Sequence, residues 1–245
     1  MQTCMKTPSP ADHACLDYWR RETAALLLLH TSYGTTEEMP VDYFFRDATE
    51  FPPLEQFALS VCQGRVLEIG AGTGGHALYL QQQGLAVTTL DTSAAAVRIQ
   101  QERGVQQALL ADYRTYNGLV YDTVLLLMNG IGVVGTLVGL RSFLQQAQQW
   151  LVPTGQLLFD SSDIAYLYDD IPAPTEHYYG EVRYQYEYQQ QRGEWFPWLY
   201  VDSETLQAVA QSLGWHAQVI FQDDTDQYVA RLTRAAAPLY KTAYD

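Results

Sequence analysis

Residues 66–75 read Val-Leu-Glu-Ile-Gly-Ala-Gly-Thr-Gly-Gly, an apolar run that passes through glycines into a segment of helix-forming residues. This order predicts a strand, a tight turn and a helix, because glycine lets the backbone turn sharply and lets a ligand approach the main chain. A helix that begins there offers free N–H groups and the positive end of its dipole. Gly70, Gly72 and Gly75 also fit the Gly-x-Gly-x-x-Gly pattern, which by itself is a weak sign of a dinucleotide site.

Three acidic residues lie where successive strands of a parallel sheet would end. Glu68 lies two residues before the first glycine, Asp91 closes the apolar run 85–90, and Asp112 follows the run 107–110. Such strand ends meet at one edge of the sheet, where open α/β sheets bind their ligands. Glu68 would repel a pyrophosphate and attract a cationic sulfonium amino acid, while Asp91 suits ribose hydroxyls and Asp112 an adenine amino group. Taken singly, the same acids also fit a loop carboxylate, a helix cap and a turn residue.

The alternation of apolar runs with amphipathic segments continues outward from this stretch and predicts a parallel sheet with helices on both faces. The expected strands are 65–69, 85–90, 107–110, 121–127, 156–160, 216–221 and 228–233. The expected helices are 74–83, 93–103, 137–151, a short helix opened by Pro52 and Pro53, and a last helix from Asp202 or Ser203 to Leu213.

Two segments depart from this rhythm. Near the N-terminus, 1–12 are expected to be irregular, 13–31 helical and 33–46 a loop-rich cap. Between the last two regular units, Tyr184, Tyr186 and Tyr188 alternate with polar residues, which predicts an antiparallel strand paired with 195–200. The expected organisation is an N-terminal cap or extension over 1–53, a main domain over 54–233 with an insertion at about 164–200, and an irregular tail over 234–245.

Composition excludes several classes of partner. The 245 residues include 28 acidic and 14 basic side chains, a formal charge of −14, so the surface repels phosphate backbones and anionic membranes. No apolar run approaches the roughly 20 residues of a membrane-spanning helix, and the run 24–29 is expected to belong to a helix rather than a signal peptide. We therefore expect a cytoplasmic protein that binds neither nucleic acid nor membrane.

No metal site is expected either. The chain has three cysteines, Cys4, Cys15 and Cys62, and their spacing matches no zinc-binding pattern. Because their number is odd, we interpret them as reduced thiols. Three of the five histidines share no ligand spacing with each other or with carboxylates: His13, His30 and His177. An acidic turn over 222–227 is interpreted as a solvated hairpin tip rather than a metal site.

The chain resembles the class I S-adenosylmethionine-dependent methyltransferases. Glu68-x-Gly70-x-Gly72-x-Gly74 looks like their first motif, Asp91 matches their ribose-binding acid, and Ala111-Asp112-Tyr113 their adenine-side motif. The stretch 121–124 is similar to the start of their fourth strand, and 151–156 to their Leu-x-Pro-Gly-Gly turn with Thr154 in place of a glycine. The resemblance covers 54–233 and implies a Rossmann-like sheet of seven strands, the last antiparallel. A group of uncharacterised bacterial methyltransferases shares stretches like 126–132, 160–163 and 196–202.

This resemblance implies S-adenosylmethionine as the cofactor. The residues assigned to it are Glu68, Gly70, Ala71, Gly72, Gly74, His76, Asp91, Thr92, Asp112, Tyr113, Met128 and Asn129. His76 is placed at the cofactor's carboxylate side, with a helix-surface histidine as the alternative. Asn129 is the candidate catalytic residue, which would orient the acceptor or the amino acid end of the cofactor, although residues 128–130 also fit a simple strand-to-loop turn.

The acceptor is expected to be a small molecule, with a protein side chain left open. Gly130 and Ile131 replace the prolines of the Asn/Asp-Pro-Pro-aromatic motif, which argues against methylation of nucleic-acid bases or glutamine amides. The candidate acceptor-binding residues are Tyr43, Arg46, Asp160 and Trp198. Aromatic clusters at 43–45, 178–179 and 195–198 predict a lid, with ordinary core or a homodimer interface through the inserted strands as the alternatives. The alternatives to a methyltransferase are an NAD(P)-dependent oxidoreductase and a non-catalytic scaffold that binds an adenosyl ligand.

Overall fold

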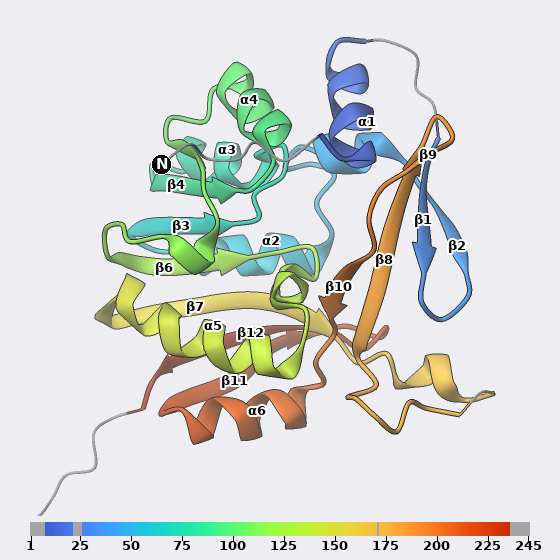
Figure 1. The fold of residues 1–245 in the computed structure, drawn as a ribbon. Coiled ribbons are helices and arrows are strands. Elements are labelled where there is room, and N and C mark those ends of the chain that lie inside the picture. The colour runs from blue at the N-terminus through green and yellow to red at the C-terminus, as the bar shows by residue number, and fades with distance from the viewer. Residues whose placement is uncertain (1–7, 22–25, 171, 236–245) are drawn as a thin grey trace, which may run out of the picture.

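The centre of the protein is a seven-stranded sheet, seen in a computed structural model that describes residues 8–21, 26–170 and 172–235 (Figure 1). The strands are β3 (Arg65–Ile69), β4 (Ala86–Asp91), β5 (Ala108–Leu110), β6 (Tyr121–Leu126), β7 (Leu151–Ser162), β11 (Trp215–Gln222) and β12 (Gln227–Arg234). Their order is β11-β12-β7-β6-β3-β4-β5. β12 pairs antiparallel with both of its neighbours, β11 and β7, and all other pairs are parallel. The predicted α/β, Rossmann-like sheet with an antiparallel last strand is confirmed.

Five helices belong to this sheet. They are α2 (Pro53–Ser60), α3 (Gly75–Gln82), α4 (Ala94–Arg103), α5 (Leu137–Trp150) and α6 (Ser203–Ser212). Four of them begin where the sequence offers a cap or a proline: Ser93, Thr136 and Asp202 accept backbone N–H bonds at the starts of α4, α5 and α6, and Pro53 is the first residue of α2. Helix α3 follows Gly74, which has no side chain to cap it. Short 3-10 helices lie at η1 (Val41–Phe45), η2 (Tyr113–Thr115), η3 (Gly130–Val134) and η4 (Ala165–Tyr168).

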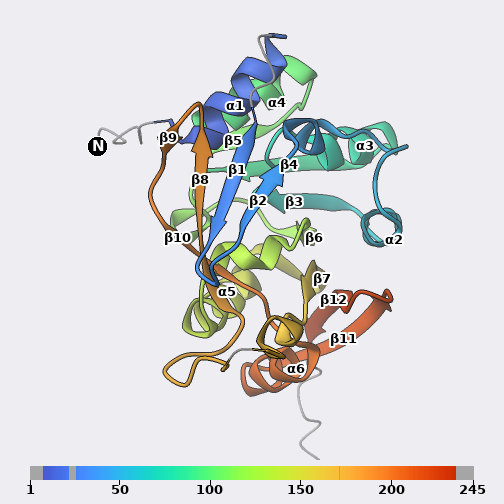
Figure 2. The same ribbon diagram turned by 90° about the vertical axis from the view of Figure 1, so that its right-hand side faces the viewer.

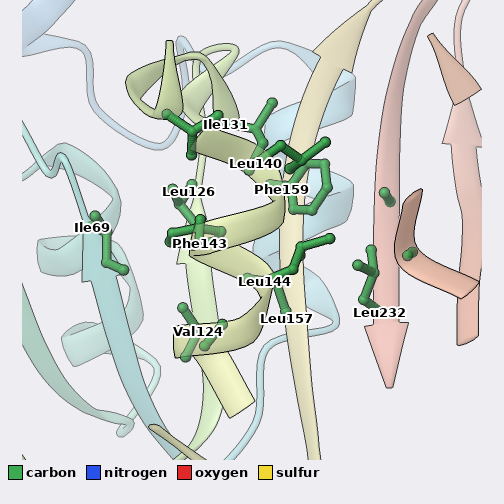
Figure 3. Close-up of a cluster of buried hydrophobic side chains, with 14 of the residues drawn as sticks. Ile69, Val124, Leu126, Ile131, Leu140, Phe143, Leu144, Leu157, Phe159 and Leu232 are labelled. Atoms are coloured by element: carbon green, nitrogen blue, oxygen red, sulfur yellow. The ribbon is translucent and has the colours of Figure 1, made fainter. Parts of the chain in front are cut away.

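The core forms because neighbouring residues of each central strand point to opposite faces of the sheet. In β6, Val124 and Leu126 pack with α5 and α6, as Figure 3 shows for α5, while Leu125 packs with α2 and α3 on the other face. The strands therefore read as continuous apolar runs, as expected for a sheet covered on both sides. β7 begins five residues earlier than expected, because Leu151 pairs with Tyr121 before a bulge, and Gln156 pairs with Thr123.

The N-terminal extension and the insertion form one antiparallel sheet, which we call the cover sheet. Its strands are β1 (Leu27–Thr31), β2 (Thr36–Met39), β8 (Glu181–Tyr188), β9 (Gln191–Arg192) and β10 (Phe196–Leu199), in the order β10-β8-β1-β2 with β9 on β8. The predicted pairing of the tyrosine strand with the segment after Gly193 is present. In Figures 1 and 2 the cover sheet stands across the carboxyl ends of the central parallel strands.

The helix expected over 13–31 is wrong in its second half. Helix α1 spans Pro10–Trp19, begins at a capping box between Ser9 and Asp12, and packs against α4 and β8. Residues 27–31 are instead strand β1, paired on both sides, with Leu27, Leu29 and Thr31 buried. The apolar run is compatible with either a helix or a strand, and it forms a strand because β2 and β8 pair with it on both sides. Residues 1–7 and 236–245, expected to be irregular, lie outside the described residues.

The cover sheet turns one face toward the main domain. Cα partners Leu29, Glu37 and Tyr186 share this face, since directly paired residues of antiparallel strands point the same way. Met39 and Tyr184, two positions away along β2 and β8, join them, as does Phe196 of β10, the Cα partner of Tyr184. This inner face supplies the aromatic side of the site described below.

Packing of α5 on the central sheet is a direct test of the fold. Phe143 is 1% exposed and its ring lies edge-on to Tyr113 and Trp150 at centroid distances of 5.3 and 5.9 Å. We expect Phe143→Ala to lower the free energy of unfolding by about 3–5 kcal/mol in urea denaturation. The matched control on the same helix, Val138→Ala, removes a side chain that is 74% exposed and should change stability by less than about 0.5 kcal/mol. Equal losses would contradict this packing.

Candidate active site

The glycine stretch turns between β3 and α3 in the left-handed region of backbone space. The backbone angle φ is 72° at Gly70, 54° at Gly72 and 86° at Gly74. A Cβ at Gly72 would meet no heavy atom within 4 Å, and one at Gly70 only Val133 at 3.7 Å, so this side of the loop is open to a ligand. A Cβ at Gly74 would lie 2.8 Å from Val105, so Gly74 is needed for packing.

Two cavities adjoin this loop and share part of their lining. The central cavity, of about 330 Å³, lies between the loop and the cover sheet, and the helix-side cavity, of about 380 Å³, lies between the loop and helix α1. Both are lined by Gly70, Gly72 and Trp198. The site residues expected from the sequence line the central cavity (Glu68, Gly70, Ala71, Gly72, His76, Met128, Asn129, Tyr43, Arg46, Asp160, Trp198) or the helix-side cavity (Asp91, Thr92, Asp112, Tyr113). Gly74 is the exception and lines neither.

Asp91 fastens the glycine loop to the start of α4. Its Oδ2 accepts from the Gly72 N–H at 2.9 Å and its Oδ1 from the Ser93 N–H at 2.8 Å. Burial, with a smaller contribution from the nearby charge of Asp12, raises the pKa of Asp91 to about 6 against the opposing effect of these N–H groups. Asp12 lies on α1, bonds to the Ser93 hydroxyl and also lines the helix-side cavity. The sequence interpretation missed Asp12 because residues 1–12 were expected to be irregular.

A buried chain of ionic side chains runs under the central cavity. Arg46 Nη2 donates to Glu55 Oε1 at 2.7 Å, His76 Nε2 lies 3.0 Å from Glu55 Oε2, and His76 Nδ1 lies 3.2 Å from Glu68 Oε1. Glu55, Glu68 and His76 are buried, and Glu68 Oε2 has no protein partner. His76 is therefore a bridge between two carboxylates rather than a helix-surface residue. Glu55 was not expected from the sequence.

The electrostatics of this chain favour a protonated imidazole. Burial alone would lower the pKa of His76, but the hydrogen bonds and charges of Glu55 and Glu68 outweigh burial and raise it to about 9. Burial would likewise raise the pKa of Glu55, but His76 and Arg46 hold it below its ordinary value. This row of ionic side chains therefore holds two cations and two anions, Glu68 belongs to the lining of the central cavity, and its buried Oε2 is left without a hydrogen bond.

The loop after β6 is held by Asp160. Its Oδ2 accepts from the Asn129 N–H at 2.8 Å and its Oδ1 from the Gly130 N–H at 3.1 Å, and burial raises its pKa to about 6 against these bonds. Met128 and Asn129 both have positive φ, 67° and 50°, a costly conformation that clusters at functional sites. Ser162 Oγ donates to Asn129 Oδ1 at 2.9 Å. Asp160 thus positions the loop, with both of its oxygens already bonded.

Aromatic side chains close the other side of the central cavity. Trp198 lies against η3, where a Cβ at Gly132 would be 2.0 Å from Trp198 Nε1, and the Arg46 guanidinium lies 3.8 Å from the centroid of the Tyr43 ring. Tyr184, Tyr186 and Phe196 also line the cavity. Their alternation in the sequence signalled a strand face, and only the tertiary pairing shows what that face covers.

The aromatic cluster at 178–179 lies elsewhere. Tyr178 OH donates to Asp202 Oδ2 at 2.5 Å, at the start of α6, and Tyr179 OH donates to Asp163 Oδ1 at 2.7 Å, directly after β7. These bonds tie the insertion to the main domain. Neither residue lines the central or the helix-side cavity, and a role of this pair in a lid or an interface stays a prediction. Across the ranges that the structure describes, no three His, Cys, Asp or Glu side chains group as metal ligands, and no helix is long and apolar enough to cross a membrane.

Comparisons with known proteins match this geometry. Residues 41–218 match the family described as a methyltransferase domain. The crystal structure of an S-adenosylmethionine-dependent methyltransferase from Bacteroides fragilis, in complex with S-adenosyl-L-homocysteine, is 35% identical, has a TM-score of 0.85, and the match covers 93% of this chain and 95% of that one. Two more distant structures share the fold: CcbJ from Streptomyces caelestis (16% identity, TM-score 0.62, 80% and 95% covered) and the sugar N-methyltransferase KedS8 from Streptoalloteichus sp. (15%, 0.57, 83% and 96%). None of the curated proteins searched matches the sequence.

Fold and site together define a class I methyltransferase. The chain belongs to the S-adenosylmethionine-dependent methyltransferase family, and it is an enzyme whose cofactor is S-adenosylmethionine. The resemblance drawn from the glycine stretch and the strand-end acids is confirmed at this level. The oxidoreductase and scaffold alternatives are set aside by the same matches.

The charge on His76 predicts a pH-dependent stability. The folded-state pKa of about 9 lies above the ordinary value of 6.5, so the stabilisation is fully present below pH 6.5 and is lost as the pH rises through about 9. We expect wild-type protein to exceed His76→Gln in free energy of unfolding by more at about pH 6 than at about pH 10, as measured by urea denaturation. His216→Gln, at an exposed histidine, should keep the wild-type pH profile. If the difference in free energy of unfolding between wild type and His76→Gln did not change with pH, a charged His76 would be contradicted.

The left-handed backbone at Asn129 predicts that a Gly variant is more stable there than an Ala variant, which is the reverse of the order within a helix. Both Asn129→Gly and Asn129→Ala lose the bond to Ser162, but only Ala places a Cβ in this conformation. We expect Asn129→Gly to be more stable than Asn129→Ala by about 1 kcal/mol in thermal or urea unfolding. At Gln145, an exposed position within α5, the order should reverse, with Ala better by about 1 kcal/mol. The same order at both positions would rule out the backbone explanation.

Proposed function

We propose that the enzyme transfers the methyl group of S-adenosylmethionine, by in-line displacement, to a small-molecule acceptor enclosed between the Asn129 loop and the cover sheet. The observation that carries the proposal is the central cavity itself. It has a buried carboxylate oxygen without a partner on one side, at Glu68, and the aromatic inner face of the cover sheet on the other. A volume of about 330 Å³ is in the range of small-ligand pockets.

The residues present fit the cofactor. A buried carboxylate oxygen that lacks a hydrogen bond is costly, and an ammonium group of the cofactor's amino acid end would satisfy Glu68 Oε2. The open side of Gly70 and Gly72 leaves room for a ligand against the backbone. On the helix side, Asp91 and Asp112 line the cavity in which ribose and adenine would lie. When bound, the cofactor supplies a methyl group already activated by its positively charged sulfur.

The tasks left to the protein are alignment and exclusion of water. The cover sheet closes the central cavity with Tyr184, Phe196 and Trp198. Asn129, whose side-chain oxygen is fixed by Ser162, is the residue that would orient the acceptor. Asp160 holds the backbone of this loop by accepting from the Asn129 and Gly130 N–H groups, and so fixes the position of the Asn129 side chain. An acceptor lone pair forms the new bond to the methyl carbon as the carbon–sulfur bond electrons pass to sulfur.

Two further expectations remain predictions. The net charge of −14 favours a small-molecule acceptor over nucleic acid and suits a cytoplasmic protein. A homodimer through the inserted strands would use the outer face of the cover sheet, because the inner face is engaged with the central cavity. Sedimentation of the purified protein at several concentrations measures whether that dimer forms.

Titration calorimetry tests the cofactor assignment. We expect S-adenosylmethionine and S-adenosyl-L-homocysteine to bind with micromolar affinity and NAD(H) not to bind. Asp91→Ala should abolish binding, because it frees two backbone N–H groups and removes the acid beside the ribose position. Asp224→Ala, which removes the same charge at an exposed turn, should bind like wild type.

A loss of cofactor binding in Asp91→Ala can be distinguished from a failure of that variant to fold. Thermal unfolding of both variants without ligand establishes that Asp91→Ala is folded before its binding is judged. Binding of NAD(H) alone would overturn the proposed function, as would a lack of any binding by the folded wild-type protein. Adenosyl binding then justifies a search for acceptors with a labelled methyl donor.

A further inference from the structure

A third cavity adjoins the central cavity on the side of Asn129. We call it the tyrosine cavity, and it shares Asn129, Tyr184, Tyr200 and Gln227 with the central cavity. It shares no lining residue with the helix-side cavity. If the adenosyl part of the cofactor occupies the helix-side cavity, it leaves the tyrosine cavity, with Asn129 on its lining, for the acceptor.

The charges of the tyrosine cavity have one sign. Glu37 from β2 and Asp226 from the β11–β12 turn lie on its lining, and among its described lining residues there is no lysine, arginine or histidine. The cations of the adjoining central cavity, Arg46 and His76, are already paired with Glu55 and Glu68. Opposite charge attracts ligands to such a mouth and like charge repels them. A carboxylate or phosphate acceptor is therefore disfavoured here.

The walls of the tyrosine cavity are aromatic and neutral. Tyr33, Tyr166, Tyr184 and Tyr200 supply rings and hydroxyls, and the hydroxyls of Tyr184 and Tyr200 lie 2.9 Å apart. Burial raises the pKa of Tyr33, raises that of Tyr184 far above its ordinary value and raises that of Tyr200 to about 12, so these three stay protonated. Neutral aromatic faces attract cations, most strongly where water is excluded.

We propose that the tyrosine cavity admits and holds the acceptor and that the acceptor is a small amine, bound as its ammonium ion. This inference rests on the proposed function and names the acceptor class for the same site. The carboxylates of Glu37 and Asp226 and the tyrosine rings recognise the ammonium group, and Asn129 lines the same cavity. After the ammonium ion releases one proton to water, the nitrogen lone pair forms the bond to the methyl carbon, and the carbon–sulfur bond electrons pass to sulfur.

The test uses three probes of one shape and different charge: benzylamine, benzyl alcohol and benzoate. Each is titrated by ligand-observed NMR against the full chain saturated with S-adenosyl-L-homocysteine. We expect benzylamine to bind more tightly than benzyl alcohol and benzoate not to bind, and we expect added salt to weaken the binding of benzylamine only.

A pair of double variants isolates the carboxylates. Glu37→Gln with Asp226→Asn removes both charges from the tyrosine cavity, whereas Glu38→Gln with Asp224→Asn makes the same changes at exposed neighbours that do not line it. We expect the first pair to weaken benzylamine binding about fivefold and the second to leave it at the wild-type value. All four side chains are exposed, so neither variant should disturb the core.

Several outcomes would overturn the inference. Tighter binding of benzoate or benzyl alcohol than of benzylamine would do so, as would equal losses in the two double variants. If the protein binds S-adenosyl-L-homocysteine but none of the probes, the acceptor class is wrong while the proposed function stands. If it fails to bind S-adenosyl-L-homocysteine, the proposed function itself fails, and the two failures are thereby distinguished.

Discussion

One imidazolium ion holds two buried carboxylates beneath the glycine loop, and much of the site depends on that arrangement. Without the charge on His76, Glu55 and Glu68 would be two anions buried near each other, an arrangement of high free energy. The same ion joins three parts of the chain, since Glu68 ends β3, His76 begins α3 and Glu55 belongs to α2. Arg46 extends the chain of ions to the N-terminal segment. The loop is therefore braced from beneath, and one Glu68 oxygen stays free for a ligand.

The site is assembled from two sheets with different tasks. The parallel strands place Glu68, Asp91 and Asp160 at one edge because their carboxyl ends coincide there. The antiparallel cover sheet contributes alternate aromatic residues from one face, because its side-chain period is two. In two of the acids, Asp91 and Asp160, both carboxylate oxygens accept hydrogen bonds from backbone N–H groups of the binding loops. They shape the binding loops, and Glu68 is the acid with an oxygen to offer.

The parts that sequence predicts are those governed by local pattern. The glycine stretch, the strand-end acids and the helices capped at Ser93, Thr136 and Asp202 follow from periodicity and turn chemistry, and the cofactor family follows from them. What sequence missed depends on distant partners. The apolar run 26–29 carries no sign of strand pairing, and Glu55 gains its role only from His76, which lies 21 residues further along the chain. Asp12 could not be placed at the cofactor side while α1 itself was unplaced.

The cover sheet has a consequence for the order in which the enzyme matures. His30 and Glu187, which meet across β1 and β8, are 157 residues apart in the chain, whereas neighbouring central strands such as β3 and β4 are linked by short connections. Closure of so long a loop is entropically slow compared with local pairing. A ribosome-bound chain would thus complete β3, β4 and β6 before β8 exists to pair with β1. The cofactor end of the enzyme can form early, and the chamber for the acceptor is sealed only once synthesis has passed the insertion.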